Sequence, residues 1–344
     1  MTTKSRLYLG VAALAIAVVL TGSVVEVSAQ QSAPAAVAID GDDIGGVVTG
    51  PSGPEAGVWV IAETTDLPTR YAKMVVTDDQ GRYVVPDLPK GKYKVWVRGY
   101  GLVDSAKVDG EPGKSLNLTA VKAPNAAAAA QYYPAIYWYS MLKIPAADQF
   151  GGKSDIPDKV KQVDWINLMK NNGCVGCHQL GQQSTRTIPP AFHDVGSSRE
   201  QWMRRIQSGQ AGESMVNIVA GQLAATPLNY FADWTDRIGK GELPHATPKR
   251  PEGVERNIVV TTWDWSTDKK YMHDLVASDR RYPTVNAYGP LFGSPEYSTD
   301  NMPILDPKTN KVSFFKMPVR DENTPIASGA KPFETSAYWG DVKL

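Results

Sequence analysis

The segment Cys174-Val175-Gly176-Cys177-His178 lies near the middle of a chain of 344 residues. It contains the only two cysteines of the sequence, three positions apart, with a histidine directly behind them. A structural zinc site needs four ligands, and the chain has no second cysteine pair. A thioredoxin-type CxxC belongs in a βαβ context, whereas the flanking segments here have a helical pattern. A disulfide across the motif is an alternative, but it gives His178 no role.

The pentapeptide has the attachment pattern of a c-type haem. Two thiols three residues apart at the end of a helix can reach both vinyl groups along one porphyrin edge. The imidazole that follows then faces the iron. We therefore expect one covalently bound haem c, attached through Cys174 and Cys177, with His178 as an iron ligand.

The first 29 residues predict export. Lys4 and Arg6 precede the apolar run 7–20, and Val27-Ser28-Ala29 is an Ala-x-Ala-like cleavage site. Without residues 1–29 the chain has 34 basic and 35 acidic residues, which gives no electrostatic attraction to nucleic acid or to an anionic membrane surface. No other stretch approaches the length of about 18 apolar residues that suggests a membrane span. We expect a periplasmic or extracellular protein without an integral membrane segment, in the compartment where bacteria attach haem c.

Residues 38–122 alternate apolar and polar side chains in short runs. Turn signals recur every 8–12 residues or so, which predicts a small antiparallel β-sandwich. The order of elements resembles the carboxypeptidase regulatory-like (transthyretin-like) domain. The matching segments are Gly57-Val58-Trp59-Val60, Thr77-Asp78-Asp79-Gln80-Gly81-Arg82-Tyr83 and Lys90-Gly91-Lys92-Tyr93-Lys94-Val95. The resemblance leaves the role open, since such a domain binds a carbohydrate or a protein partner or serves as a spacer.

Residues 159–244 carry apolar side chains at helical spacing. Three helices are expected: one that ends at Asn171-Asn172-Gly173, one that Ser197 caps, and one from Thr226-Pro227 to Gly239. The first expected helix has one apolar stripe, formed by Val160, Val163, Ile166, Leu168 and Met169. The region resembles a class I cytochrome c over about 85 residues. That resemblance implies a central all-α cytochrome c fold.

The same resemblance implies two contacts on the proximal side of the haem. In the family, a proline about a dozen residues after the haem histidine accepts the ring N–H of that histidine, and Pro190 has this place. Such a bond fixes the tautomer of His178. The preceding Pro189 is a second candidate, and Phe192 matches the apolar residue of the family that packs against the haem face.

The sixth iron ligand is expected from the loop that follows the second helix, where the family has a methionine. Met215, in the segment 209–215, has that placement. Met203 and His193 are alternative ligands, and ordinary packing would also account for Met215. With both axial positions filled by the protein, the haem binds no substrate and moves one electron at a time.

Two further regions complete the expected organisation. The linker 123–158 contains five aromatic residues within residues 132–139, so we expect it to pack on a neighbouring domain or to form an aromatic wall beside a redox centre. Residues 252–344 are β-rich, and a hairpin around residues 306–310, followed by Pro318, resembles the blades of virginiamycin B lyase-like propellers. A blade needs about 40–45 residues and a propeller at least four blades. The region is therefore expected either to pack on the other domains as a non-propeller extension, or to be a partial propeller that is completed beyond Leu344.

The sequence thus predicts a multidomain α and β protein: an N-terminal antiparallel β-sandwich, a central all-α cytochrome c fold and a C-terminal β-rich propeller-like region. The expected function is one-electron transfer in the periplasm by an exported monohaem c-type cytochrome, alone or as part of a larger oxidoreductase, with redox partner proteins. One alternative is a surface protein that binds a carbohydrate or a partner. Another is an enzyme with its active site in a propeller completed beyond residue 344, for which the sequence indicates no catalytic residue.

Overall fold

The computed structural model describes residues 37–208, 212–265, 281–282, 284, 289–293, 301–316 and 318. The predicted export signal and cleavage site lie outside these residues. Within the described part of the chain, no helix has both the length and the apolar character needed to cross a membrane.

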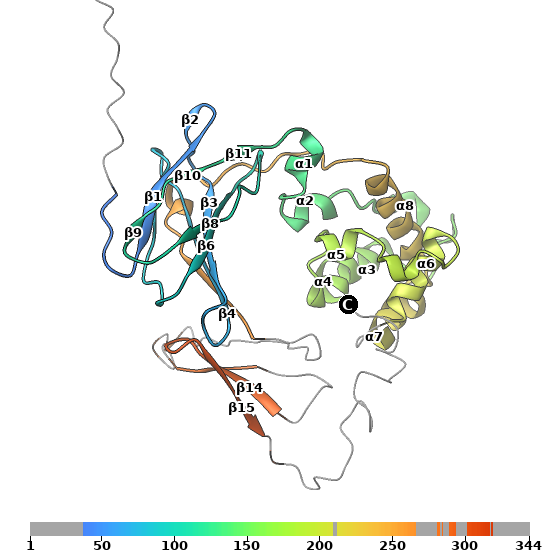
Figure 1. The fold of residues 1–344 in the computed structure, drawn as a ribbon. Coiled ribbons are helices and arrows are strands. Elements are labelled where there is room, and N and C mark those ends of the chain that lie inside the picture. The colour runs from blue at the N-terminus through green and yellow to red at the C-terminus, as the bar shows by residue number, and fades with distance from the viewer. Residues whose placement is uncertain are drawn as a thin grey trace, which may run out of the picture. The chain divides into compact units, whose positions relative to one another are not determined.

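Strand β1 (Ile44–Gly50) is the centre of the first of two five-stranded sheets (Figure 1). It pairs antiparallel with β2 (Gly53–Pro54) and β5 (Arg82–Val85), and parallel with β9 (Lys114–Ser115) and β10 (Leu118–Thr119). The two parallel pairs correct the prediction of a purely antiparallel sandwich. They are possible because the chain builds most of the second sheet before it returns to β1, and parallel pairing requires a long crossover of this kind.

The second sheet is antiparallel throughout, in the order β12-β4-β3-β6-β8. Its strands are β3 (Trp59–Thr64), β4 (Arg70–Val76), β6 (Tyr93–Arg98), β8 (Val108–Gly110) and β12 (Val260–Asp264). The edge strand β12 comes from the region for which the sequence predicted a propeller. Beside this sheet, β7 (Leu102–Val103) pairs with β11 (Val121–Lys122).

The two sheets share one apolar core. Successive residues of a strand point to opposite faces, so every second side chain of the alternating segments turns inward. Ile44, Val48 and Val85 of the first sheet are fully buried, and so are Val60 and Val95 of the second.

The turn before β5 shows how local chemistry sets a strand boundary. One carboxylate oxygen of Asp78 accepts the backbone N–H groups of Gln80 (2.9 Å) and Arg82 (2.8 Å). Gly81 has a φ angle of +71°, and a Cβ at this position would press on the carbonyl oxygen of Val48. A glycine is therefore needed in the turn.

The segment from residue 123 to residue 259 contains short helices. The predicted linker includes two of them, α1 (Ala126–Ala130) and α2 (Ala135–Tyr139). The others are α3 (Gln162–Asn167), α4 (Cys174–Cys177), α5 (Gln183–Arg186), α6 (Ser198–Ile206), α7 (Gly212–Val216) and α8 (Pro227–Gly239). Two π-helical turns follow α3 and α7, at Leu168–Asn172 and Asn217–Gln222, and short 3-10 turns lie at Ala147–Gln149, Pro190–Phe192 and Gly253–Arg256.

The prediction of a central all-α cytochrome c fold is wrong. The described chain is a mixture of several antiparallel sheets and short helices, and no sizeable all-α domain is found in it. Among the α-helices of the described residues, only α6, with nine residues, and α8, with 13, are longer than six residues. Apolar spacing of 3.6 residues does not distinguish a continuous helix from a series of short turns, and helices of this length depend on tertiary packing.

The first expected helix illustrates the error. Val163, assigned to its buried stripe, is 69% exposed, whereas Trp165 is 2% exposed. The regular helix stops at Asn167, and Met169 in the π-helical turn that follows is buried, as the stripe predicts. The error therefore lies within α3, where Trp165 and not Val163 faces the core.

Two of the expected helices are confirmed. Ser197 caps α6 through a capping box with Glu200, in which the Ser197 backbone N–H donates to a Glu200 carboxylate oxygen at 2.6 Å. Helix α8 begins at Pro227 and ends at Gly239, as expected. Its buried face packs against the aromatic linker, because the Trp234 indole N–H donates to the carbonyl oxygen of Trp138 at 2.9 Å.

The C-terminal region contributes β12 and a three-stranded antiparallel sheet to the described structure. This sheet consists of β13 (Leu291–Phe292), β14 (Asn301–Asp306) and β15 (Lys311–Lys316), with the hairpin at its expected place. Trp263 of β12 donates its indole N–H to the side-chain oxygen of Asn310 in the hairpin turn at 2.7 Å. Much of residues 266–300 and nearly all of residues 317–344 lie outside the described part, and most of the expected propeller-like region with them.

Candidate functional site

Cys174, His178 and Met215 line one cavity of about 160 Å³. Cys174 begins α4, His178 follows the last residue of that helix, and Met215 lies on α7. A thiol, an imidazole and a thioether from two separate helices therefore border the same space.

The local geometry of α4 explains how the first two groups come together. The helix is a single turn, in which the His178 backbone N–H donates to the Cys174 carbonyl oxygen at 2.8 Å. This bond folds the CxxCH segment into one turn and brings the first cysteine and the histidine to the same cavity. Gly173 stands directly before the turn, and a Cβ there would collide with the carbonyl oxygen of Leu168. The close approach of the preceding π-helical turn thus requires glycine.

His178 is half-buried, and its surroundings favour the neutral imidazole. Burial lowers the pKa of His178, and the positive charge of Arg205 lowers it further. The neutral ring has a lone pair to offer, which is the form that binds a metal ion.

Met215 differs from expectation in its secondary structure. The sequence predicted a loop over residues 209–215, but residues 212–216 form α7, and residues 209–211 lie outside the described part. Its side chain is half-buried and lines the cavity.

The sequence favoured Pro190 over Pro189 as the proline beside His178, and the structure places them the other way round relative to the cavity. Pro190 is exposed, does not line the cavity, and its carbonyl oxygen accepts the backbone N–H of His193 at 3.1 Å. Pro189, the second candidate, does line the cavity. Phe192 is 3% exposed and also lines the cavity.

Neither alternative to Met215 lines the cavity. The His193 side chain is exposed, and its Nε2 lies 3.0 Å from the carbonyl oxygen of Ile188. Met203 is half-buried and packs against the apolar core of the helical region. Among the three candidates for a sixth ligand, only Met215 shares a cavity with His178.

Arg205 is a cavity residue that the sequence analysis missed. Its guanidinium lies 4.8 Å from the centre of the Trp202 ring and donates to the carbonyl oxygens of Thr187 (2.7 Å) and Ser184. Burial lowers the pKa of Arg205 to about 10, and no ion pair of this residue occurs in the described part of the chain. Because Trp202 and Arg205 are three residues apart on α6, helical spacing alone could have placed both on one face.

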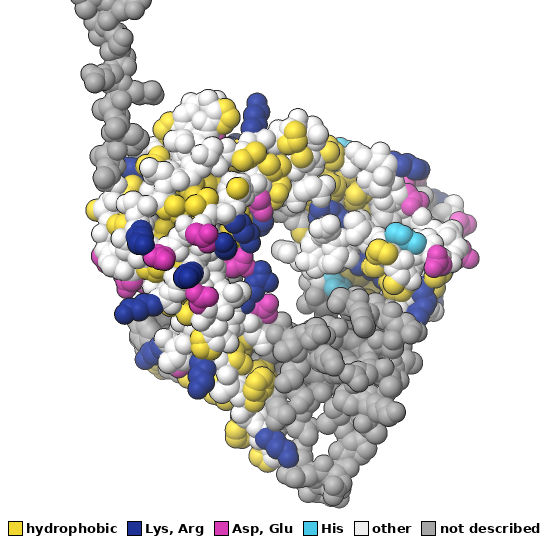
Figure 2. Space-filling view, in the orientation of Figure 1, with side chains coloured by type: hydrophobic (Ala, Val, Ile, Leu, Met, Phe, Trp, Pro, Cys, Tyr) yellow, Lys and Arg dark blue, Asp and Glu magenta, His cyan; other side chains and the backbone are white. Residues whose placement is uncertain are grey.

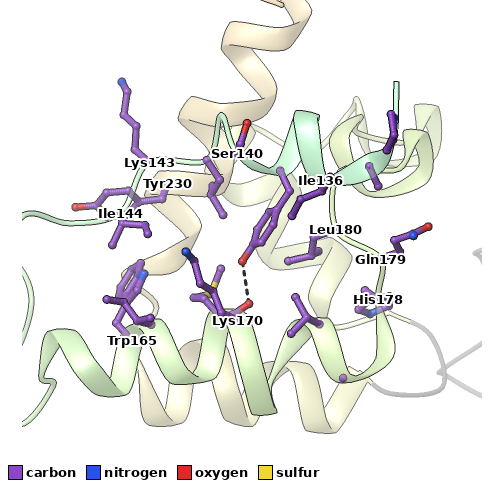
Figure 3. A pocket seen from close by; sticks show the side chains of 18 residues that line it. Ile136, Ser140, Lys143, Ile144, Trp165, Lys170, His178, Gln179, Leu180 and Tyr230 are labelled. Atoms are coloured by element: carbon purple, nitrogen blue, oxygen red, sulfur yellow. Dashed lines mark hydrogen bonds between the residues drawn. The ribbon is translucent and has the colours of Figure 1, made fainter. Parts of the chain in front are cut away.

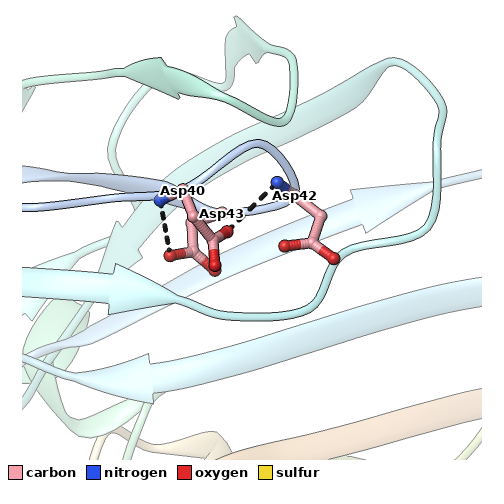
Figure 4. A group of neighbouring side chains, drawn as sticks. All are labelled: Asp40, Asp42 and Asp43. Carbon is pink, nitrogen blue, oxygen red and sulfur yellow. Dashed lines mark hydrogen bonds between the residues drawn. The ribbon is translucent and has the colours of Figure 1, made fainter.

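A group of three carboxylates precedes β1 (Figure 4). The side chains of Asp40, Asp42 and Asp43 each offer an oxygen within 4.8 Å of the others. Asp43 accepts the backbone N–H of Asp40 at 3.1 Å, and Asp40 accepts that of Asp42 at 3.2 Å. These bonds show that the three carboxylates stabilise the turn that leads into the sheet. We assign no metal to them.

The donor set of the cavity fits a c-type haem in its chemistry, because a thiol, a neutral imidazole and a thioether face an apolar enclosure formed in part by Trp202 and Phe192. Its volume of about 160 Å³ lies below the range of roughly 300–1,000 Å³ typical of small-molecule sites, so a porphyrin requires the cavity to widen. No protein-family model matches the chain, and no curated protein matches it.

Proposed function

We propose that this protein attaches one haem c covalently at Cys174 and Cys177 and transfers single electrons. One observation carries the proposal: the CxxCH histidine and Met215, which belong to different helices, line the same cavity as Cys174. The all-α fold that first suggested Met215 is not part of the proposal. The ligand assignment rests on the shared cavity instead.

The haem, when bound, supplies a one-electron couple. Burial keeps the His178 ring neutral and available to the iron, and the Met215 sulfur faces the same space. Phe192, Trp202 and Val219 are each at most 5% exposed and exclude water from the cavity. An apolar surround that excludes solvent raises the reduction potential of such a centre. With both axial positions filled by side chains, the chain offers no open position for a substrate.

We also propose that the protein works outside the cytoplasm and exchanges electrons with partner proteins. The support lies in the sequence, where a basic start, an apolar run and a small-residue cleavage site occupy residues 1–29. Covalent haem attachment outside the cytoplasm agrees with that signal.

The proposal is tested by expressing the full chain in a bacterium that carries the haem-maturation machinery. On a denaturing gel stained for haem, the wild-type polypeptide should keep its haem, whereas the double variant Cys174→Ala/Cys177→Ala should lose it. His178→Ala should remove an iron ligand. His193→Ala is its matched control, because His193 is exposed and does not line the cavity. Haem that acidic organic solvent extracts from the wild-type protein would contradict the proposal.

A further inference from the structure

A second, larger cavity of about 810 Å³ lies in the helical region (Figure 3). It shares only His178 and Leu180 with the cavity described above. We call it the aromatic cavity. Its lining comes from α2 and the loop after it, from α3 and its π-helical turn, from the CxxCH segment and from α8. The volume falls within the range of roughly 300–1,000 Å³ in which proteins bind small molecules.

The inner wall of the aromatic cavity is buried and apolar. Trp165, Met169 and Leu180 are 2%, 4% and 8% exposed. The ring of Tyr230 meets that of Trp165 edge to face, with 5.2 Å between the ring centres. The Tyr139 hydroxyl donates to the Met169 carbonyl oxygen at 2.8 Å, the dashed line in Figure 3, so this polar group is already paired. Such a wall favours a flat, apolar body.

The charge of the lining has one sign. Lys143 and Lys170 both line the cavity, and none of its lining residues is an aspartate or a glutamate. Lys143 pairs with Asp233 at 3.2 Å, outside the lining. Lys170 is exposed, and no ion pair of this residue occurs in the described part of the chain. In Figure 3 its side chain extends toward the middle of the view, whereas Lys143 points away from it.

We propose that the aromatic cavity binds a small organic anion of the aromatic carboxylate class. The ring of the ligand packs against the accessible parts of Tyr230 and Ile144, and its carboxylate lies near the ammonium group of Lys170. A sugar would find few polar partners on the buried wall, and a cation would meet the positive charge of Lys170 with no carboxylate in the lining to offset it. The inference does not depend on haem attachment, because it rests on the lining of this cavity alone.

The test is calorimetric titration of the full-length protein with 1-naphthoate and with its uncharged analogue 1-naphthylmethanol. We expect one binding site, with 1-naphthoate bound about two- to fivefold more tightly, the contribution of one exposed charge pair. Lys170→Gln should remove this preference, while Lys161→Gln, an exposed lysine outside the lining, should keep it.

A second pair of variants separates binding from folding. Ile136 lines the cavity and is 63% exposed, so Ile136→Glu should fold, because exposed substitutions change stability little. Its carboxylate should weaken 1-naphthoate binding about fivefold by charge repulsion and leave 1-naphthylmethanol unchanged. Val163→Glu is the matched control, because Val163 is 69% exposed, apolar and outside the lining.

Any of the following results would overturn the inference: no measurable binding of 1-naphthoate, equal binding of the charged and uncharged analogues, or the same response from Ile136→Glu and Val163→Glu. Tighter binding of decanoate than of 1-naphthoate would also overturn it, since that result points to an alkyl chain. The titration is repeated on Cys174→Ala/Cys177→Ala. If this variant loses its haem but still binds 1-naphthoate, the two proposals are independent of each other.

Discussion

Arg205→Gln should lower the reduction potential of the haem-loaded protein by about 50–100 mV. The guanidinium lines the same cavity as His178 and Met215, and a nearby positive charge disfavours the ferric state, which carries one more positive charge than the ferrous state. We take a separation on the order of 7 Å between the guanidinium and the iron, because the two groups would border the same cavity. At an effective dielectric constant of about 20, one charge at this distance changes the energy by about 2.4 kcal/mol. This corresponds to about 100 mV for one electron, and solvent screening of the half-buried side chain reduces it by up to about half.

The measurement is a spectroelectrochemical titration of the wild-type protein and three variants. Arg205→Lys keeps the charge and should shift the potential by less than half as much as Arg205→Gln. The control is Arg199→Gln, because Arg199 is exposed, does not line the cavity and donates to the side-chain oxygen of Asn229 at 2.9 Å. Equal potentials for Arg205→Gln and Arg199→Gln would refute the electrostatic reasoning.

Three further changes test other parts of the description. Met215→His should lower the potential, because imidazole favours ferric iron relative to a thioether, while Met203→Leu should not; a thioether–iron absorption band that survives Met215→Ala would place the ligand elsewhere. Ser197→Ala should destabilise the protein by about 1 kcal/mol in denaturant unfolding, through loss of the α6 cap, and an unchanged midpoint would contradict that role. Burial raises the pKa of Tyr139 to about 12, so the unfolded chain loses this proton first and stability should fall as the pH rises from about 10 towards 12; Tyr139→Phe should flatten that decline, and identical pH profiles would argue against it.

The local sequence pattern was sufficient to predict several strands of the sandwich. The alternating segments around Val60, Val85 and Val95 coincide with β3, β5 and β6, because period-2 patterning and turn chemistry act over a few residues. The pairing partners of these strands could not be predicted from the sequence. The parallel pairing of β1 with β9 and β10, and the pairing of β12 with β4, join segments that are distant in the chain, and no short-range signal marks them.

In the helical region, short-range patterns likewise carried no information on distant contacts. The fold predicted there was therefore wrong and the predicted site incomplete. Helical spacing identified α6 and α8, which have a cap or a proline at their start, but it joined α3 and its π-helical turn into one regular helix. The CxxCH motif is local, so its residues could be named from the sequence. Met215 was selected by chain order and shares the cavity with His178, whereas Pro190 was selected in the same way and is exposed. Arg205 was missed because a cation on an apolar helix face gives no motif.

The pairing of β12 with β4 bears on the order in which the chain can fold as it is synthesised. The Thr262 hydroxyl donates to the Ala72 carbonyl oxygen across a separation of 190 residues. The second sheet can therefore add its edge strand β12 only after the whole helical segment has been synthesised. Closing so long a loop is slow, although each doubling of loop length adds only about 0.6 kcal/mol of entropy cost. Until then β4 is an open edge that can pair with another chain. The whole helical segment is therefore synthesised before the second sheet can be completed.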